Sequence, residues 1–266
     1  MNSLLQLTDT QIQSWVASFI LPLVRVAALL MALPIFGGPL LPQRIRLFLA
    51  LAITVCIAPT LPPMPEVHAL DLSGLLLVAE EIIIGTLLGF SLQFLFQVFV
   101  VAGQIIAVQI GMSFAAMVDP TNGVSSPVIG QFFTMLVTLL FLSMNGHLVV
   151  FEVLTESFTT LPVGATLVTG KFWDLVLRLG WVLGAGILLV LPAITALLVI
   201  NIAFGVMTRA APQLNIFSIG VPLTLVIGMV ILWISMGDIL DQYQPMATDA
   251  LQWLRRLAGS QGPGAG

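Results

Sequence analysis

Long apolar runs make up most of this chain, and short segments with proline, glycine or charged residues separate them. The runs extend over residues 12–33, 47–61, 72–102, 128–151, 179–204 and 216–240. Because backbone N–H and C=O groups in a bilayer must be satisfied within the protein, such runs are expected to be helices. The pattern therefore predicts an all-α integral membrane protein with about six apolar helical blocks.

Two of the runs differ from a simple crossing segment, which needs about 20 apolar residues. The run at 47–61 is short and ends in LPPMP, where the prolines cannot continue a helix. The run at 72–102 is too long for one straight crossing, so it should tilt, bend or leave the hydrocarbon. Other runs contain Pro22, Pro192 and Pro222, so we expect blocks with proline and glycine breaks.

A close helix–helix contact is expected within the run at 72–102. Its sequence GTLLG places Gly85 and Gly89 four residues apart, a small-xxx-small pattern that lets two helices approach closely. Ordinary packing between membrane helices accounts for this pattern, and we assign no further role to the two glycines.

Composition agrees with the apolar pattern. Hydrophobic residues make up 59% of the 266 positions and charged residues only 8%. A soluble domain carries roughly 25% charged residues, so water is not the main solvent for this surface. The chain has no Lys/Arg cluster interleaved with aromatic residues, so nucleic acid is not an expected partner.

The basic residues give no orientation for six crossings. If all six runs crossed, one side would carry Arg44, Arg46 and Arg209, and the other Lys171, Arg178, Arg255 and Arg256. Three residues against four is no bias under the positive-inside rule. Either partner proteins impose the topology, or some runs form helical hairpins buried in protein.

Charged side chains inside or beside the runs are candidates for function. Arg25 lies deep in the first run, where an arginine costs about 2.5 kcal/mol or more unless it faces protein or water. Glu80 and Glu81 are the candidate partners for a structural ion pair. A charge shared with a neighbouring subunit or an aqueous path is the alternative. Arg209 follows the fifth run, either as a helix-end cation facing carbonyl groups or as a contact to a neighbouring subunit.

Catalytic and metal-binding patterns are missing from the sequence. His68 and His147 are the only histidines, and neither has Cys, Asp or Glu at metal-ligand spacing. Ser143 and His147 are four residues apart and could share a helix face, but no oxyanion site accompanies them. We expect no enzyme activity, no metal and no cofactor.

Four stretches carry more specific motifs. They are LVRVAALLMALPIFGGPLLPQRIRLFLALAI from Leu23, EIIIGTLLGF from Glu81, the segment with Gly111, Phe114 and Asp119-Pro120, and FGVMTRAAPQLNIFSIGVPL from Phe204. Together they resemble the FliR family of flagellar export-gate proteins, whose counterparts in virulence secretion systems are called SctT. The resemblance covers nearly the whole chain, except its two ends and the connection at 161–178.

This resemblance implies a core subunit of the flagellar type III export gate. It implies assembly with FliP and FliQ, with FlhB and FlhA-like proteins nearby, in the bacterial inner membrane at the flagellar basal body. The fold would resemble a fused FliP–FliQ unit, FliP-like in its N-terminal part and FliQ-like in its C-terminal part. This single helical domain would cover residues 1–258, with a disordered tail at 259–266, and membrane lipid would surround it. The gate would pass unfolded flagellar subunits while energy is supplied elsewhere.

The segment 111–130, GMSFAAMVDPTNGVSSPVIG, interrupts the apolar pattern. Asp119 is its only charged residue, Pro120 follows directly, and Gly123 suits a positive backbone φ, so the segment has the composition of a turn. The plain interpretation is an ordinary connection between two helices, with its apolar side chains packed inward.

The resemblance favours a second interpretation, in which residues 111–123 form a loop that plugs the pore. Met112, Phe114 and Met117 would then point toward the axis. Methionine is flexible and apolar, so such a constriction can exclude water and ions and still adapt to a passing chain.

Three alternatives to a flagellar gate subunit remain. The equivalent subunit of a virulence secretion system fits the same motifs. A secondary transporter would also use broken helices and a buried arginine, but it should show repeated halves, and we find no convincing repeat. An intramembrane hydrolase would depend on the weak Ser143/His147 pair.

The C-terminal segment PMATDALQWLRRLAG is expected to form a short amphipathic helix. Met246, Leu251, Trp253, Leu254 and Leu257 would lie on or near one side. Arg255 and Arg256 would suit an anionic cytoplasmic membrane surface.

Overall fold

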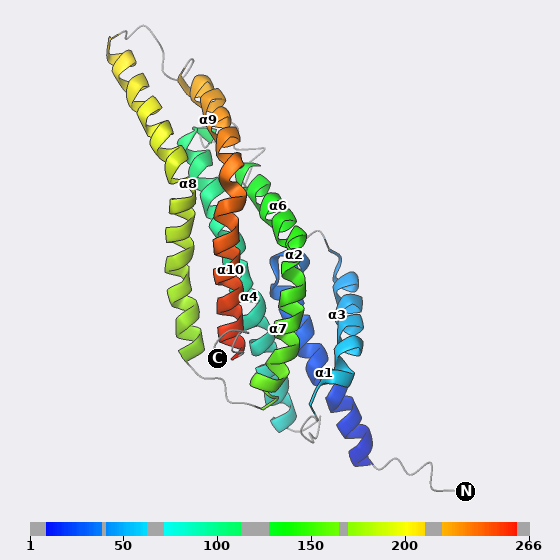
Figure 1. Cartoon of the computed structure of the whole chain (residues 1–266). Helices are drawn as coiled ribbons and strands as arrows, with labels where there is room; N and C mark the ends of the chain where they lie inside the picture. The colour runs from blue at the N-terminus through cyan, green and yellow to red at the C-terminus, as the bar shows by residue number, and fades with distance from the viewer. Residues whose placement is uncertain are drawn as a thin grey trace, which may run out of the picture. The chain divides into compact units, whose positions relative to one another are not determined.

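The computed structural model describes residues 9–38, 41–62, 72–112, 128–164, 170–210 and 220–259 (Figure 1). All secondary structure within these ranges is helical. The predicted all-α fold is therefore confirmed, and each of the six apolar runs lies on helix over most of its described length.

The chain folds into two compact units. Unit 1 consists of Met1–Phe94, Asn145–Val176 and Asp249–Gly266, and unit 2 consists of Leu95–Met144 and Leu177–Thr248. Three long helices contribute residues to both units: α4 (Leu72–Gln109), α8 (Gly170–Ala210) and α10 (Ile239–Ala258).

The described part of unit 1 contains five further helices. They are α1 (Asp9–Ala32), α2 (Pro34–Gly37), α3 (Gln43–Ile57), the 3-10 helix η1 (Ala58–Thr60) and α7 (Gly146–Thr160). Proline sets several of their boundaries: Pro34 is the first residue of α2, and Pro42 directly precedes α3. Proline fits at the start of a helix because the N–H that it lacks would have no partner there.

Unit 2 contains α6 (Val128–Ser143), α9 (Val221–Ser235) and the 3-10 helix η3 (Met236–Asp238). Aromatic rings of different helices pack against each other in this unit. The ring centroids of Phe96 in α4 and Phe141 in α6 are 5.7 Å apart, and those of Phe99 in α4 and Tyr243 in α10 are 5.8 Å apart. The interior of this unit is therefore built from apolar and aromatic contacts.

Four described helical segments are long and apolar enough to cross a membrane. They are Gln43–Thr60, Leu72–Gln109, Trp173–Ala210 and Pro222–Ala258. A fifth crossing results if α6 and α7 together count as one broken span, whereas the apolar part of α1, Ser18–Ala32, is shorter. Several apolar helices of crossing length support the assignment as a membrane protein.

One apolar run is not a continuous helix. The run at 128–151 is broken between α6 and α7, where Asn145 adopts a left-handed conformation with φ 57° and Gly146 begins α7. Asn and Gly tolerate such breaks better than other residues. The expectation that Ser143 and His147 share a helix face is wrong, because Ser143 ends α6 and His147 lies in the first turn of α7.

Pro22 and Pro192 do not break their helices, contrary to the expectation, whereas Pro222 lies in the first turn of α9. Pro22 lies inside α1, and Pro192 lies inside the 41 residues of α8. The run at 72–102 contains no proline and is one continuous helix that extends to Gln109, longer than one straight crossing needs. Membrane helices tolerate proline because neighbouring groups can satisfy the freed backbone carbonyls.

The C-terminal segment forms α10, but its apolar side is buried within the chain. Trp253, Leu254 and Leu257 are at most 8% exposed, and the Trp253 ring lies 6.0 Å from that of Phe94 in unit 1. The predicted placement of this helix on a membrane surface is therefore wrong, because a surface helix inserts its apolar side into lipid.

Candidate functional site

Arg25 is fully buried in unit 1. It lies in α1, and the apolar residues Val26, Leu29 and Leu30 of the same helix are buried around it. A buried guanidinium group is unfavourable unless its charge is neutralised and its N–H groups are hydrogen-bonded. The partners of Arg25 therefore decide what this site can do.

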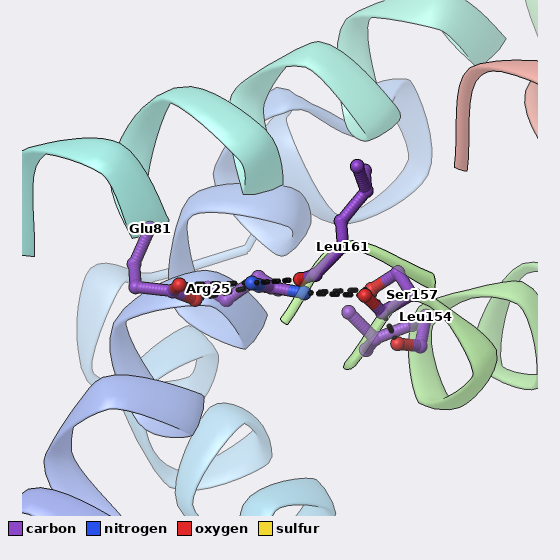
Figure 2. A network of polar contacts seen from close by, with 5 residues as sticks. All are labelled: Arg25, Glu81, Leu154, Ser157 and Leu161. Carbon is purple, nitrogen blue, oxygen red and sulfur yellow. Dashed lines mark hydrogen bonds and ion pairs between the residues drawn. The ribbon is translucent and has the colours of Figure 1, made fainter. Parts of the chain in front are cut away.

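Glu81 neutralises the charge of Arg25. The Arg25 Nε atom lies 2.5 Å from Oε2 of Glu81, and Nη2 lies 2.8 Å from Oε1 (Figure 2). The Glu81 side chain is also fully buried, in α4. This two-point pairing matches the fork of a guanidinium group to the two oxygens of a carboxylate, the strongest common arrangement of such a pair.

The remaining donors of Arg25 bind the end of α7. Nη1 donates to the backbone oxygen of Ser157 at 2.9 Å and to its Oγ at 3.2 Å, and Nη2 donates to the backbone oxygen of Leu161 at 2.9 Å (Figure 2). The last carbonyl groups of a helix have no partners within it and carry a partial negative charge. The Leu161 carbonyl is one of them, whereas the Ser157 carbonyl also accepts a hydrogen bond from the backbone N–H of Leu161 at 2.9 Å, so Arg25 binds the C-terminal end of α7 at two carbonyl groups.

Each of the five N–H donors of Arg25 therefore has an acceptor. The network continues through Ser157, whose Oγ donates to the backbone oxygen of Leu154 at 2.6 Å. The guanidinium carbon also lies 4.2 Å from the centroid of the Phe158 ring, within the range of a cation–π contact. Three helices, α1, α4 and α7, are joined at this one side chain.

Gly85 and Gly89 let α1 and α4 approach closely enough for this pairing. A Cβ atom added at Gly85 would lie 2.8 Å from Cβ of Ala28 and would also meet the backbone oxygen of Arg25. At Gly89 it would lie 2.6 Å from Cβ of Ala32. Helix packing at small residues in membranes depends on such approach of the two backbones.

Glu80, the other candidate partner, does not pair with Arg25. Successive residues of a helix point about 100° apart, so only one of two adjacent glutamates can face α1. Glu80 is half-buried, and its Oε2 atom is buried without a hydrogen-bond partner in the described part of the chain.

The other predicted site residues are not part of this network. Arg209 lies in the last turn of α8 and is exposed. Met112 is half-buried and follows Gly111, which ends α4 in a left-handed conformation with φ 83°. Five of the predicted plug residues lie outside the described residues: Phe114, Met117, Asp119, Pro120 and Gly123.

Sequence reasoning missed the contribution of α7. Ser157, Phe158 and Leu161 were not singled out, although TESFTT at 155–160 is a polar cluster at the end of an apolar helix. That polar cluster could have indicated that the end of this helix binds a charged side chain. It also missed the ion pair between Arg255 and Glu152, whose side chains lie 3.2 Å apart in unit 1.

Other reactive side chains do not assemble into a second site in the described ranges. Ser143 donates its hydroxyl to the backbone oxygen of Leu140 at 2.9 Å. No group of three or more His, Cys, Asp or Glu side chains within these ranges is placed to hold a metal ion.

Comparison with known proteins gives one consistent result. The family model for bacterial export proteins, family 1, matches residues 16–250. The flagellar biosynthetic protein FliR of Escherichia coli K12 is 41% identical over 227 residues, which cover 85% of this chain and 87% of the relative. The FliR protein of Pectobacterium carotovorum is 37% identical over 88% of this chain and 88% of its own length. The FliR protein of Bacillus subtilis is 26% identical over 90% of this chain and 94% of its own length.

Proposed function

We propose that this chain forms a closed conduit in the inner membrane together with FliP and FliQ, as a component of a flagellar export apparatus. The chain belongs to the bacterial export proteins, family 1. The conduit would pass unfolded flagellar subunits. The observation that carries this proposal is the family match over residues 16–250, which includes most of every described helix. FlhB and FlhA-like proteins are the further partners that we propose.

The Arg25 network supports a structural role in this conduit. All five N–H donors of Arg25 are used within unit 1, and Glu81 balances its charge. A transporter that binds a small solute at a buried arginine would need a free donor there. The geometry therefore favours a fixed wall that holds α1, α4 and α7 together.

Two features of the segment after α4 support a plug. Gly111 ends the helix in a left-handed conformation, as glycine commonly does at a helix C-terminus. The segment between Gln109 and Val128 covers residues 110–127, more chain than a short turn between two helices needs. We propose that Met112, Phe114 and Met117 of this segment close the conduit at rest.

The test is ion conductance of the assembled apparatus in planar bilayers. Replacement of Met112, Phe114 and Met117 by alanine should open a leak for ions, because the apolar constriction is lost. The matched control replaces one exposed phenylalanine and two exposed methionines, Phe132, Met135 and Met144, by alanine. The assembly with this control variant should stay closed to ions. Equal conductance of the plug variant and the unmodified assembly would contradict the plug.

A further inference from the structure

Two arginines lie at the beginning of α3, in the least buried of the four crossing-length segments. Only 11% of the positions of Gln43–Thr60 are buried. Arg44 and Arg46 both belong to the first turn of α3, and this turn has no acidic side chain. We propose that this end of α3 binds the headgroups of anionic phospholipids, one at each arginine. The inference concerns the chain itself and does not depend on FliP or FliQ.

The described part of the chain leaves the charge of both arginines unbalanced. Arg44 is exposed, and neither Arg44 nor Arg46 forms an ion pair within the described ranges. The dipole of a helix favours anions and not cations at its N-terminal end, so α3 does not stabilise these two charges. An anion from outside the chain would therefore stabilise this end of the helix.

Arg46 is held by one hydrogen bond and keeps donors for a headgroup. Its Nη2 atom donates to the backbone oxygen of Gly38, at the end of α2. Its Nε atom is buried and has no hydrogen-bond partner in the described ranges, so the guanidinium group is only partly satisfied. Phosphate oxygens fit the planar fork of such a group. Arg44 lies two residues earlier, about 200° around the helix, so each arginine reaches a different headgroup.

Apolar side chains beside the arginines favour a lipid over a dissolved anion. Ile45, Leu47 and Phe48 are 50%, 55% and 70% exposed. Acyl chains can cover these side chains, and arginines at the end of an apolar helix extend to the level of the headgroups. A dissolved phosphate ion would leave the apolar surface uncovered.

The two ends of α3 also differ in their basic residues. Arg44 and Arg46 lie at its beginning, whereas residues 61–71 after the helix include Glu66 and Asp71 and no Lys or Arg. An anionic leaflet attracts basic residues next to a membrane segment, with a gain of roughly fivefold in affinity for each residue. The beginning of α3 is therefore the end that fits an anionic leaflet.

Native mass spectrometry of the full chain in detergent tests the proposal with two lipids, phosphatidylglycerol and the net-neutral phosphatidylcholine. The unmodified chain should retain two molecules of phosphatidylglycerol at concentrations at which phosphatidylcholine does not bind. Arg44→Gln and Arg46→Gln should each weaken one of these two sites roughly fivefold, and the double variant should weaken both. Arg44 has no hydrogen bond or ion pair in the described part of the chain, so Arg44→Gln should stay folded, as a thermal unfolding curve will show.

Arg209→Gln is the matched control. It removes the same charge from an exposed arginine in the last turn of α8, where the helix dipole already favours a cation, and should leave both lipids bound. Arg44→Lys keeps the charge and should also retain them. Equal binding of the two lipids, an equal loss for Arg209→Gln, or displacement by inorganic phosphate at the same concentration would overturn the inference. Release of both lipids on assembly with FliP and FliQ would overturn it as well, because the arginines would then bind protein.

Discussion

Different interactions stabilise the interior of unit 1 and the interior of unit 2. In unit 1, Arg25, Glu81 and Ser157 are fully buried and connect three helices by hydrogen bonds and charge. In unit 2, the buried side chains with a hydroxyl group in the described part are Thr224, which donates back to Gly220 within its own helix turn, and Tyr243, whose ring packs against Phe99. Aromatic rings join helices of unit 2 at Phe96 and Phe141 and at Phe99 and Tyr243.

This difference has a physical consequence. Hydrogen bonds and ion pairs are directional, so the network of unit 1 favours one arrangement of α1, α4 and α7 and penalises others. Apolar helix packing depends on shape alone and tolerates small shifts at lower cost. We therefore expect substitutions of polar residues to destabilise unit 1 much more than unit 2.

The largest effect is expected for Glu81→Ala. This substitution leaves the positive charge of Arg25 buried without a counter-ion, which typically costs about 3–5 kcal/mol. Thermal or denaturant unfolding of the purified chain in detergent measures the loss. Glu80→Ala is the matched control, since Glu80 does not pair with Arg25, and it should cost far less.

A double substitution sharpens this prediction. Arg25→Met combined with Glu81→Leu removes both charges, so most of the lost stability should return. Equal losses for the single substitutions of Glu80 and Glu81, or no recovery in the double variant, would show that the ion pair does not hold unit 1 together.

Substitutions of tightly packed glycines should lower the stability of both units by similar amounts. The difference between the units is therefore expected for polar residues and not for glycines. Gly85→Ala in unit 1 and Gly103→Ala in unit 2 each place a methyl group against the backbone of a neighbouring helix, at Arg25 and Gly130 respectively. Such overpacking costs about 1–3 kcal/mol. Gly184→Ala meets open space and should be neutral or slightly stabilising. A loss at Gly85 without one at Gly103 would mean that the helices of unit 2 separate without cost.

A smaller difference is expected between two buried hydroxyl groups. Ser157→Ala removes one acceptor of Arg25 and should cost about 1 kcal/mol. Thr224→Val in unit 2 removes only a bond within its own helix and should change stability by less than about 0.5 kcal/mol. Equal losses at the two positions, measured by the same unfolding assay, would contradict the distinction between the units.

Only a small effect is expected for the partly exposed ion pair of unit 1. The Arg255 and Glu152 side chains are 21% and 52% exposed, so solvent screens their attraction. Glu152→Ala should cost between 0 and about 1 kcal/mol, and added salt should reduce the difference. A loss as large as that of Glu81→Ala would show that exposure does not separate the two ion pairs.

The sequence was sufficient to predict the helical class, the apolar runs and the close approach at Gly85 and Gly89. It was also sufficient to identify Arg25 as a buried charge, because an arginine deep within an apolar run must face protein or water rather than lipid. It could not decide between Glu80 and Glu81, since that choice depends on the rotation of α4 relative to α1.

Other features depend on contacts that are distant in the chain. Ser157 and Leu161 lie 132 and 136 positions after Arg25, and no local pattern links them to it. The break at Asn145 was missed because the apolar pattern continues through it, and one left-handed residue was enough to end the helix. The C-terminal helix was misplaced because an amphipathic pattern does not distinguish burial against protein from burial in lipid.

Native mass spectrometry of the tagged chain, gently extracted after co-expression with FliP and FliQ, tests the central claim most directly. We expect a discrete complex that contains this chain together with several copies of small membrane proteins. A stable monomer or homodimer that remains alone in the presence of both partners would contradict the role as a gate subunit.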